Sequence, residues 1–212
     1  MPARANRLSA VVRAKHARLS EPHIAPFVAL ADEIAAARGL TPGEVPYPDP
    51  EFAGTAAQAL VLLQSPGPKT SKTTGSGLLS LENDDPSAQR CYDEYRRAGL
   101  DWHQVLHWNT VPWPTASTDP SGKDLRDARP WLPRLLALLP EIKAVLLLGR
   151  VARDEWRRAA TTELTRMPLV PVFIGPHPSQ RGMARANAKE RLSDAIEKLA
   201  GTLSTYPREN RV

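Results

Sequence analysis

The sequence predicts an α/β fold: a three-layer α/β/α sandwich around a central four-stranded, mainly parallel sheet. Four short apolar runs have the length of buried strands, and helical patterns alternate with them. Strands that are covered on both faces read as continuous apolar runs, and strands that alternate with helices form parallel sheets. The four expected strands are residues 59–63, 104–108, 144–148 and 170–174.

Apolar residues at helical spacing predict the elements that cover this sheet. The expected helices are residues 26–38, 86–98, 124–139, a helix that begins near Arg150, and 183–199. Asp85 has the chemistry of an N-cap, Pro86 suits the first helical position, and Gly99 suits the end of the same helix. In the third helix, Pro130 and Pro133 either delay the start or kink the axis.

Length and charge divide the chain into three expected parts. The chain has 212 residues, 42% of them hydrophobic, which fits one compact domain with a substantial core. Residues 1–20 hold five basic and no acidic side chains, and this segment alone accounts for the formal charge of +5. We expect a basic N-terminal arm and helix at 1–44, the α/β/α domain at 45–201, and a flexible tail at 202–212. The arm either contacts a polyanion or forms a solvated helix.

The composition also excludes several kinds of metal site and classes of protein. A single cysteine, Cys91, excludes a disulfide framework, a four-cysteine zinc site and an iron–sulfur cluster. No apolar run reaches transmembrane length, and the first residues lack the apolar core of a signal peptide. We therefore expect a cytoplasmic, monomeric protein without a metal or another cofactor and without a membrane partner.

Distinctive polar residues follow three of the expected strands, where open α/β sheets hold their sites. After the last strand, His177 lies between two prolines that restrict its backbone. Ser179 and Arg181 supply a hydroxyl and a cation that suit a phosphate. After the second strand, the amide of Asn109 can read the edge of a base. The plain alternative for His177 is a rigid loop with a solvated histidine.

Three separated motifs, in the same order and after the same strands, resemble those of the uracil-DNA glycosylase superfamily. They are Gln64-Ser65-Pro66-Gly67-Pro68, Asn109-Thr110-Val111-Pro112 and His177-Pro178-Ser179. The resemblance covers roughly residues 45–200. It implies a DNA-repair enzyme that binds DNA, flips a base out of the stack and hydrolyses its N-glycosidic bond, leaving an abasic site.

The resemblance also implies roles for single residues. His177 would hydrogen-bond the base oxygen where negative charge develops, and Asn109 would pair with the base edge. Lys69, Ser179 and backbone N–H groups near Gly67 would hold phosphates. Arg181 follows at the position of the wedge that fills the gap left by the flipped base.

The sequence departs from the superfamily's pattern at the residues that activate water and stack on the base. Ser65 stands where several branches carry an Asp or Asn, and Gln64 stands where one branch carries an acid. Leu78 replaces the stacking aromatic residue. Neither Gln64 nor Ser65 titrates near neutral pH, so neither is a general base without help.

Three interpretations of these departures remain open. Gln64 and Ser65 position a water, Asp84 or Asp85 supplies the carboxylate, or the pocket serves a base other than uracil. For Asp84 and Asp85, helix capping is the plain alternative. A second function is a catalytically inactive DNA-binding protein on the same fold, and a third is a nucleotide or small-molecule enzyme on an unrelated doubly wound fold.

Overall fold

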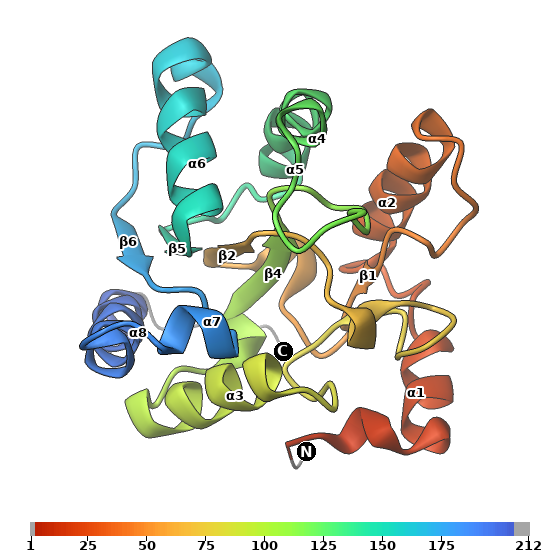
Figure 1. The fold of residues 1–212 in the computed structure, drawn as a ribbon, viewed down its shortest axis with the longest axis horizontal. Helices are drawn as coiled ribbons and strands as arrows, with labels where there is room; N and C mark the ends of the chain where they lie inside the picture. Colours follow the sequence, from red (N-terminus) through yellow and green to blue (C-terminus); the bar gives the residue numbers. More distant parts are fainter. Residues whose placement is uncertain (1–2, 206–212) are drawn as a thin grey trace.

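The computed structural model describes residues 3–205, and a four-stranded parallel sheet lies at its centre (Figure 1). The strands run in the order β4-β2-β5-β6, and every neighbouring pair is parallel. They are β2 (Ala59–Leu63), β4 (Val105–Asn109), β5 (Ala144–Leu148) and β6 (Val172–Gly175). All residues of β4 and β5 are buried. The predicted α/β/α sandwich is confirmed.

Helices cover both faces of this sheet (Figure 1). On one face lie α3 (Pro86–Ala98) and α8 (Ala188–Ser204), which contact each other. On the other face lie α2 (Ala25–Ala37), α4 (Gly122–Ala128), α5 (Trp131–Ala137) and α6 (Arg150–Thr162). The chain leaves β2 toward one face and β5 toward the other, so a crevice opens beyond the carboxyl ends of these neighbouring strands.

Short elements complete the fold. Strands β1 (Tyr47–Pro48) and β3 (Leu78–Leu79) pair in a second, two-stranded parallel sheet. Helix α1 (Ser9–His16) lies near the N-terminus. Helix α7 (Gln180–Met183) follows β6. The 3-10 helices are Ala5–Arg7, Gly54–Ala56, Pro68–Thr70, Trp102–Gln104 and Leu164–Arg166. No helix among residues 3–205 is long and apolar enough to cross a membrane.

Local chemistry explains which predicted elements have the right bounds. Helix α3 begins at Pro86 because Asp85 accepts hydrogen bonds from the backbone N–H groups of Ser87 and Ala88, at 2.8 and 3.0 Å. It ends at Gly99, which has a φ of 67°. The predicted strands at 59–63 and 144–148 have the observed bounds. The other two strands begin later than predicted, at Val105 and Val172.

Two predicted helices and the tail need correction. The single helix expected at 124–139 is two helices, because Pro130 ends α4 and caps α5. The helix expected at 183–199 is also two, because Asn187 has a φ of 54° just before α8. The tail expected at 202–212 is helical through Ser204, and residues 206–212 lie outside the described part.

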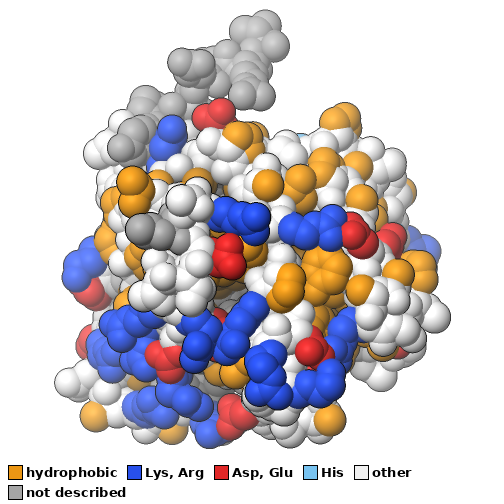
Figure 2. All heavy atoms as spheres, turned by 90° about the horizontal axis from the view of Figure 1, so that it is seen from above, with side chains coloured by type: hydrophobic (Ala, Val, Ile, Leu, Met, Phe, Trp, Pro, Cys, Tyr) orange, Lys and Arg blue, Asp and Glu red, His pale blue; other side chains and the backbone are white. Residues whose placement is uncertain are grey.

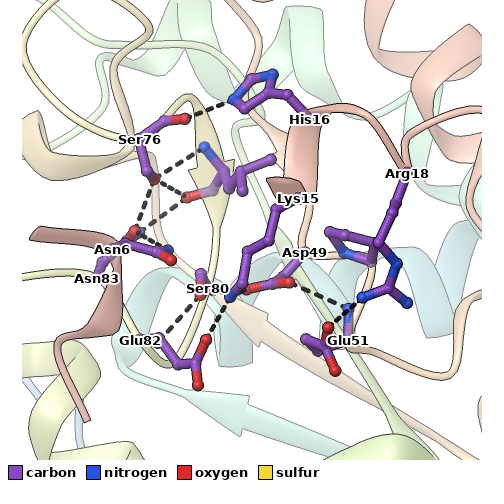
Figure 3. A network of polar contacts seen from close by, with 12 residues as sticks. Asn6, Lys15, His16, Arg18, Asp49, Glu51, Ser76, Ser80, Glu82 and Asn83 are labelled. Atoms are coloured by element: carbon purple, nitrogen blue, oxygen red, sulfur yellow. Dashed lines mark hydrogen bonds and ion pairs between the residues drawn. The ribbon is translucent and has the colours of Figure 1, made fainter. Parts of the chain in front are cut away.

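The N-terminal segment packs against the domain through buried polar contacts (Figure 3). Lys15 on α1 is 1% exposed and pairs with the carboxylates of Asp49 and Glu82. The amide of Asn6 donates to the side-chain oxygen of Asn83 at 2.9 Å. Lys15 is therefore neither a solvated residue nor a surface contact for a polyanion.

Candidate active site

A cleft of about 1450 Å³ lies at the carboxyl ends of the parallel strands. Loops that follow β2, β4, β5 and β6 line it, so the three polar motifs of the sequence meet there. Nine of the predicted site residues line this cleft: Gln64, Ser65, Gly67, Lys69, Asp85, Asn109, His177, Ser179 and Arg181.

The ring of His177 has a defined tautomer. The backbone N–H of Ser179 donates to Nδ1 of His177 at 3.1 Å, so the proton of a neutral ring sits on Nε2. Burial lowers the pKa of His177, and the negative charge of Asp85 opposes this shift. The balance favours a neutral imidazole at pH 7, with Nε2–H available as a hydrogen-bond donor.

Close backbone packing holds the His177 loop in place. Arg90 on α3 donates to the carbonyl oxygen of Pro178 at 2.7 Å. Gly149 has a φ of 103°, and a Cβ there would lie 3.0 Å from Cβ of His177. A Cβ at Gly182 would lie 1.9 Å from the carbonyl oxygen of His177, which no side chain tolerates. Both positions therefore require glycine for the loop to approach its neighbours.

Asn109 ends β4 inside the cleft and carries an unsatisfied donor. The residue is 5% exposed, and its Nδ2 has no hydrogen-bond partner among the described residues. A buried amide without a partner is costly, and native proteins keep few of them. Such a group suits a ligand that supplies the missing acceptor.

The loop between β4 and α4 closes one side of the cleft. Gln64 donates from Nε2 to the carbonyl oxygen of Thr118 at 2.6 Å. Asp119, the next residue, pairs with Arg181 at 2.9 Å, and this contact lowers the pKa of the Asp119 carboxyl. Asp119 was not predicted from the sequence, because it lies 62 residues before Arg181 and belongs to no motif.

Two of the described residues that line the cleft carry a carboxylate, Asp85 and Asp119. The Asp119 carboxylate is engaged by Arg181. Both capping hydrogen bonds of Asp85 go to Oδ1, and no described residue occupies Oδ2. The negative charge of Asp85 also acts on His177, which lines the same cleft. Asp85 therefore caps α3 and also lines the cleft.

The residues that line this cleft lie within a match to a known protein family. Residues 52–200 match the family model of the uracil DNA glycosylase superfamily. The chain belongs to the uracil-DNA glycosylase superfamily. Among curated proteins, no relative matches the sequence. The matched region contains all four strands of the main sheet and every loop that lines the cleft, so this superfamily of DNA-acting enzymes gives the chain its general class.

Two of the predicted site residues, Asp84 and Leu78, do not line the cleft. Asp84 is outside the cleft and pairs with Arg4 at 3.1 Å. Leu78 is fully buried in β3, whereas its neighbour Leu79 lines the cleft. Successive side chains of a strand point to opposite faces, so Leu79 and not Leu78 faces the cleft.

Ser179 makes two hydrogen bonds that shape the loop around His177. The hydroxyl of Ser179 accepts from the N–H of Gly182 at 3.2 Å and so caps α7, while its backbone N–H holds His177.

Within residues 3–205, no group of three His, Cys, Asp or Glu side chains is arranged to hold a metal ion. Cys91 is buried, and burial raises the pKa of its thiol to about 12.

Proposed function

We propose that this protein is a DNA glycosylase that flips uracil or another modified base into the cleft and hydrolyses its N-glycosidic bond. One observation carries the proposal: two unoccupied donors, Nε2–H of His177 and Nδ2 of Asn109, line the same cleft. Carbonyl oxygens on the edge of a flipped base are acceptors that would satisfy both.

Hydrolysis breaks the bond between C1′ and the base nitrogen, and the electron pair leaves with the base. The base then carries negative charge, and the sugar becomes cation-like. A neutral His177 donates to the oxygen where that charge develops, from a partly buried position in the cleft. A donor in this position typically contributes a factor of about 10² to 10³ in rate.

The carboxylate of Asp85 is our candidate for the negative group that faces the cation-like sugar. Its negative charge stabilises the cation-like sugar, and its free Oδ2 can accept a proton from the attacking water. Ser65 and Gln64 line the same cleft and position that water. The water oxygen bonds to C1′, one of its protons goes to the carboxylate or to solvent, and the product is an abasic site.

The test is an alkaline-cleavage assay on labelled oligonucleotides. Uracil is offered in single-stranded and paired form beside a panel of other modified bases. Strand breaks at uracil support the uracil form of the proposal, and breaks only at another base mean that the pocket serves that base. DNA binding without breaks at any base would leave a catalytically inactive DNA-binding protein, which is the second candidate.

A further inference from the structure

Three unpaired arginines line the cleft on one side. They are Arg150, the first residue of α6, Arg185 between α7 and α8, and Arg191 in α8. We call this set the arginine wall. All three are exposed, and no described residue forms a hydrogen bond or a salt bridge with their guanidinium groups, although Arg150 interacts electrostatically with Asp119 and Asp154. A stripe of arginines on α6 usually signifies a solvated face, but Arg150 faces the site.

The topology explains why the wall is one-sided. Arg150 follows β5, and Arg185 and Arg191 follow β6, which is the edge strand next to β5. Lys69 follows β2, and β2 and β6 lie on opposite sides of β5 in the strand order (Figure 1). Figure 2 shows the basic character of the surface, with Lys and Arg side chains gathered in the lower part of the face seen from above.

The cleft is too large for a base alone. Its volume of about 1450 Å³ exceeds the roughly 300–1,000 Å³ that is usual for a small-molecule pocket. The flipped base would occupy the part near His177 and Asn109. The remainder, bordered by the arginine wall, has the size and charge for the sugar–phosphate chain of neighbouring nucleotides. Guanidinium groups bind phosphate oxygens through paired hydrogen bonds.

We infer that the arginine wall binds phosphates of the DNA that flank the flipped nucleotide, on the side of α6 and α8. The inference rests on the proposed function in taking DNA as the partner, but it does not depend on catalysis. Each phosphate that a cation neutralises adds about 0.7 to the salt slope of binding for single strands and about 0.9 for duplexes. Three contacts therefore add about 2 to 3 to that slope.

The experiment compares two triple variants of the full chain that lose the same charge. The wall variant carries Arg150→Gln, Arg185→Gln and Arg191→Gln. The control carries Arg96→Gln, Arg126→Gln and Arg157→Gln, because these residues are exposed, also lack a partner among the described residues, and do not line the cleft. Equal net charge removes differences in long-range attraction between the two variants.

Fluorescence anisotropy measures the affinity of each variant for a labelled, undamaged oligonucleotide across a series of salt concentrations, in single-stranded and duplex form. On the form that the wild type binds more tightly, the slope of the wall variant should fall by about 2 or more, while the control keeps a slope within about 0.5 of the wild type. Equal slopes in the two variants, or a wild type that binds neither form, would overturn the inference. Thermal unfolding confirms that both variants fold.

The outcome is separable from the fate of the proposed function. The wild type could bind DNA, with a lower salt slope for the wall variant than for the control, and yet release no base. That result would refute the proposed glycosylase activity and support the phosphate site. If the wild type releases base but the two variants have equal salt slopes, the glycosylase activity is supported and the phosphate site is refuted.

Discussion

The backbone N–H of Ser179 donates a hydrogen bond to Nδ1 of His177 at 3.1 Å. This contact links a capping residue of α7 to the ring that faces the cleft, and it fixes which nitrogen carries the proton. Because burial also lowers the pKa of His177, a neutral donor needs no further group to maintain it. The Pro-His-Pro-Ser sequence thus sets the position and the protonation of one side chain together.

The packing of Gly149 against His177 predicts that a side chain at this glycine slows base release by displacing the histidine. Gly149→Ala places a Cβ 3.0 Å from Cβ of His177 at a φ of 103°, a backbone conformation that costs other residues about 1–3 kcal/mol. We expect single-turnover base release to slow at least tenfold while DNA affinity changes little. Gly201→Ala is the control, because a Cβ there meets nothing within 4 Å and should stabilise α8. Equal rates for both variants would show that Gly149 does not position His177.

The buried histidine of β4 predicts a pH dependence of stability. His107 stacks on Phe52 at 4.8 Å and hydrogen-bonds the Tyr95 hydroxyl at 2.7 Å, and burial lowers its pKa to about 3. Above pH 6.5 the ring is neutral in both states, and its full contribution is present. As the pH falls from 6.5 toward 3, the unfolded chain takes up a proton that the folded chain does not.

The free energy of unfolding therefore falls by about 1.4 kcal/mol per pH unit in that window. Urea unfolding at pH 7 and pH 5 should show a loss of about 2 kcal/mol in the wild type that His107→Gln lacks. Parallel pH profiles for the two proteins would mean that the ring is protonated in the folded state as well.

The buried pairing of Lys15 predicts that the N-terminal segment supports the domain. Lys15→Ala leaves the carboxylates of Asp49 and Glu82 without their cation, and such a loss costs about 3–5 kcal/mol. Arg13→Ala on the exposed face of the same helix should change stability by less than about 0.5 kcal/mol. Denaturant unfolding measures both, and a similar small effect for Lys15→Ala would show that α1 is dispensable.

The pairing of Asp119 with Arg181 predicts that one substitution strengthens DNA binding. Both side chains are exposed by half or more, so the pair itself contributes little to stability. Asp119→Asn removes a negative charge from a basic cleft and releases Arg181 for phosphate. We expect the affinity for DNA at low salt to rise by up to about fivefold. A weaker affinity would indicate that Asp119 holds Arg181 in its binding position.

The sequence predicted the sheet well, because most residues of its strands are apolar and because the intervening helix α3 has clear caps at Asp85 and Gly99. It also predicted that Asn109 and His177 lie at one edge of the sheet, since parallel strands bring their carboxyl ends together. Asp119 was not predictable, because its place depends on how the long loop between β4 and α4 folds. Arg150 follows β5, but a charge stripe on a helix usually indicates a solvated face. Leu78 and Leu79 show the limit in another way: adjacent leucines look equivalent until the pairing of β1 with β3 decides which one faces the cleft.

The most direct test of the proposed mechanism is single-turnover release of free base by the wild type and by His177→Ala, measured on the DNA that the wild type cleaves best. The loss of the neutral Nε2–H donor should slow release by about 10² to 10³ while DNA affinity stays nearly unchanged. Equal release rates, or no free base from either protein while DNA binding persists, would contradict a catalytic role for His177.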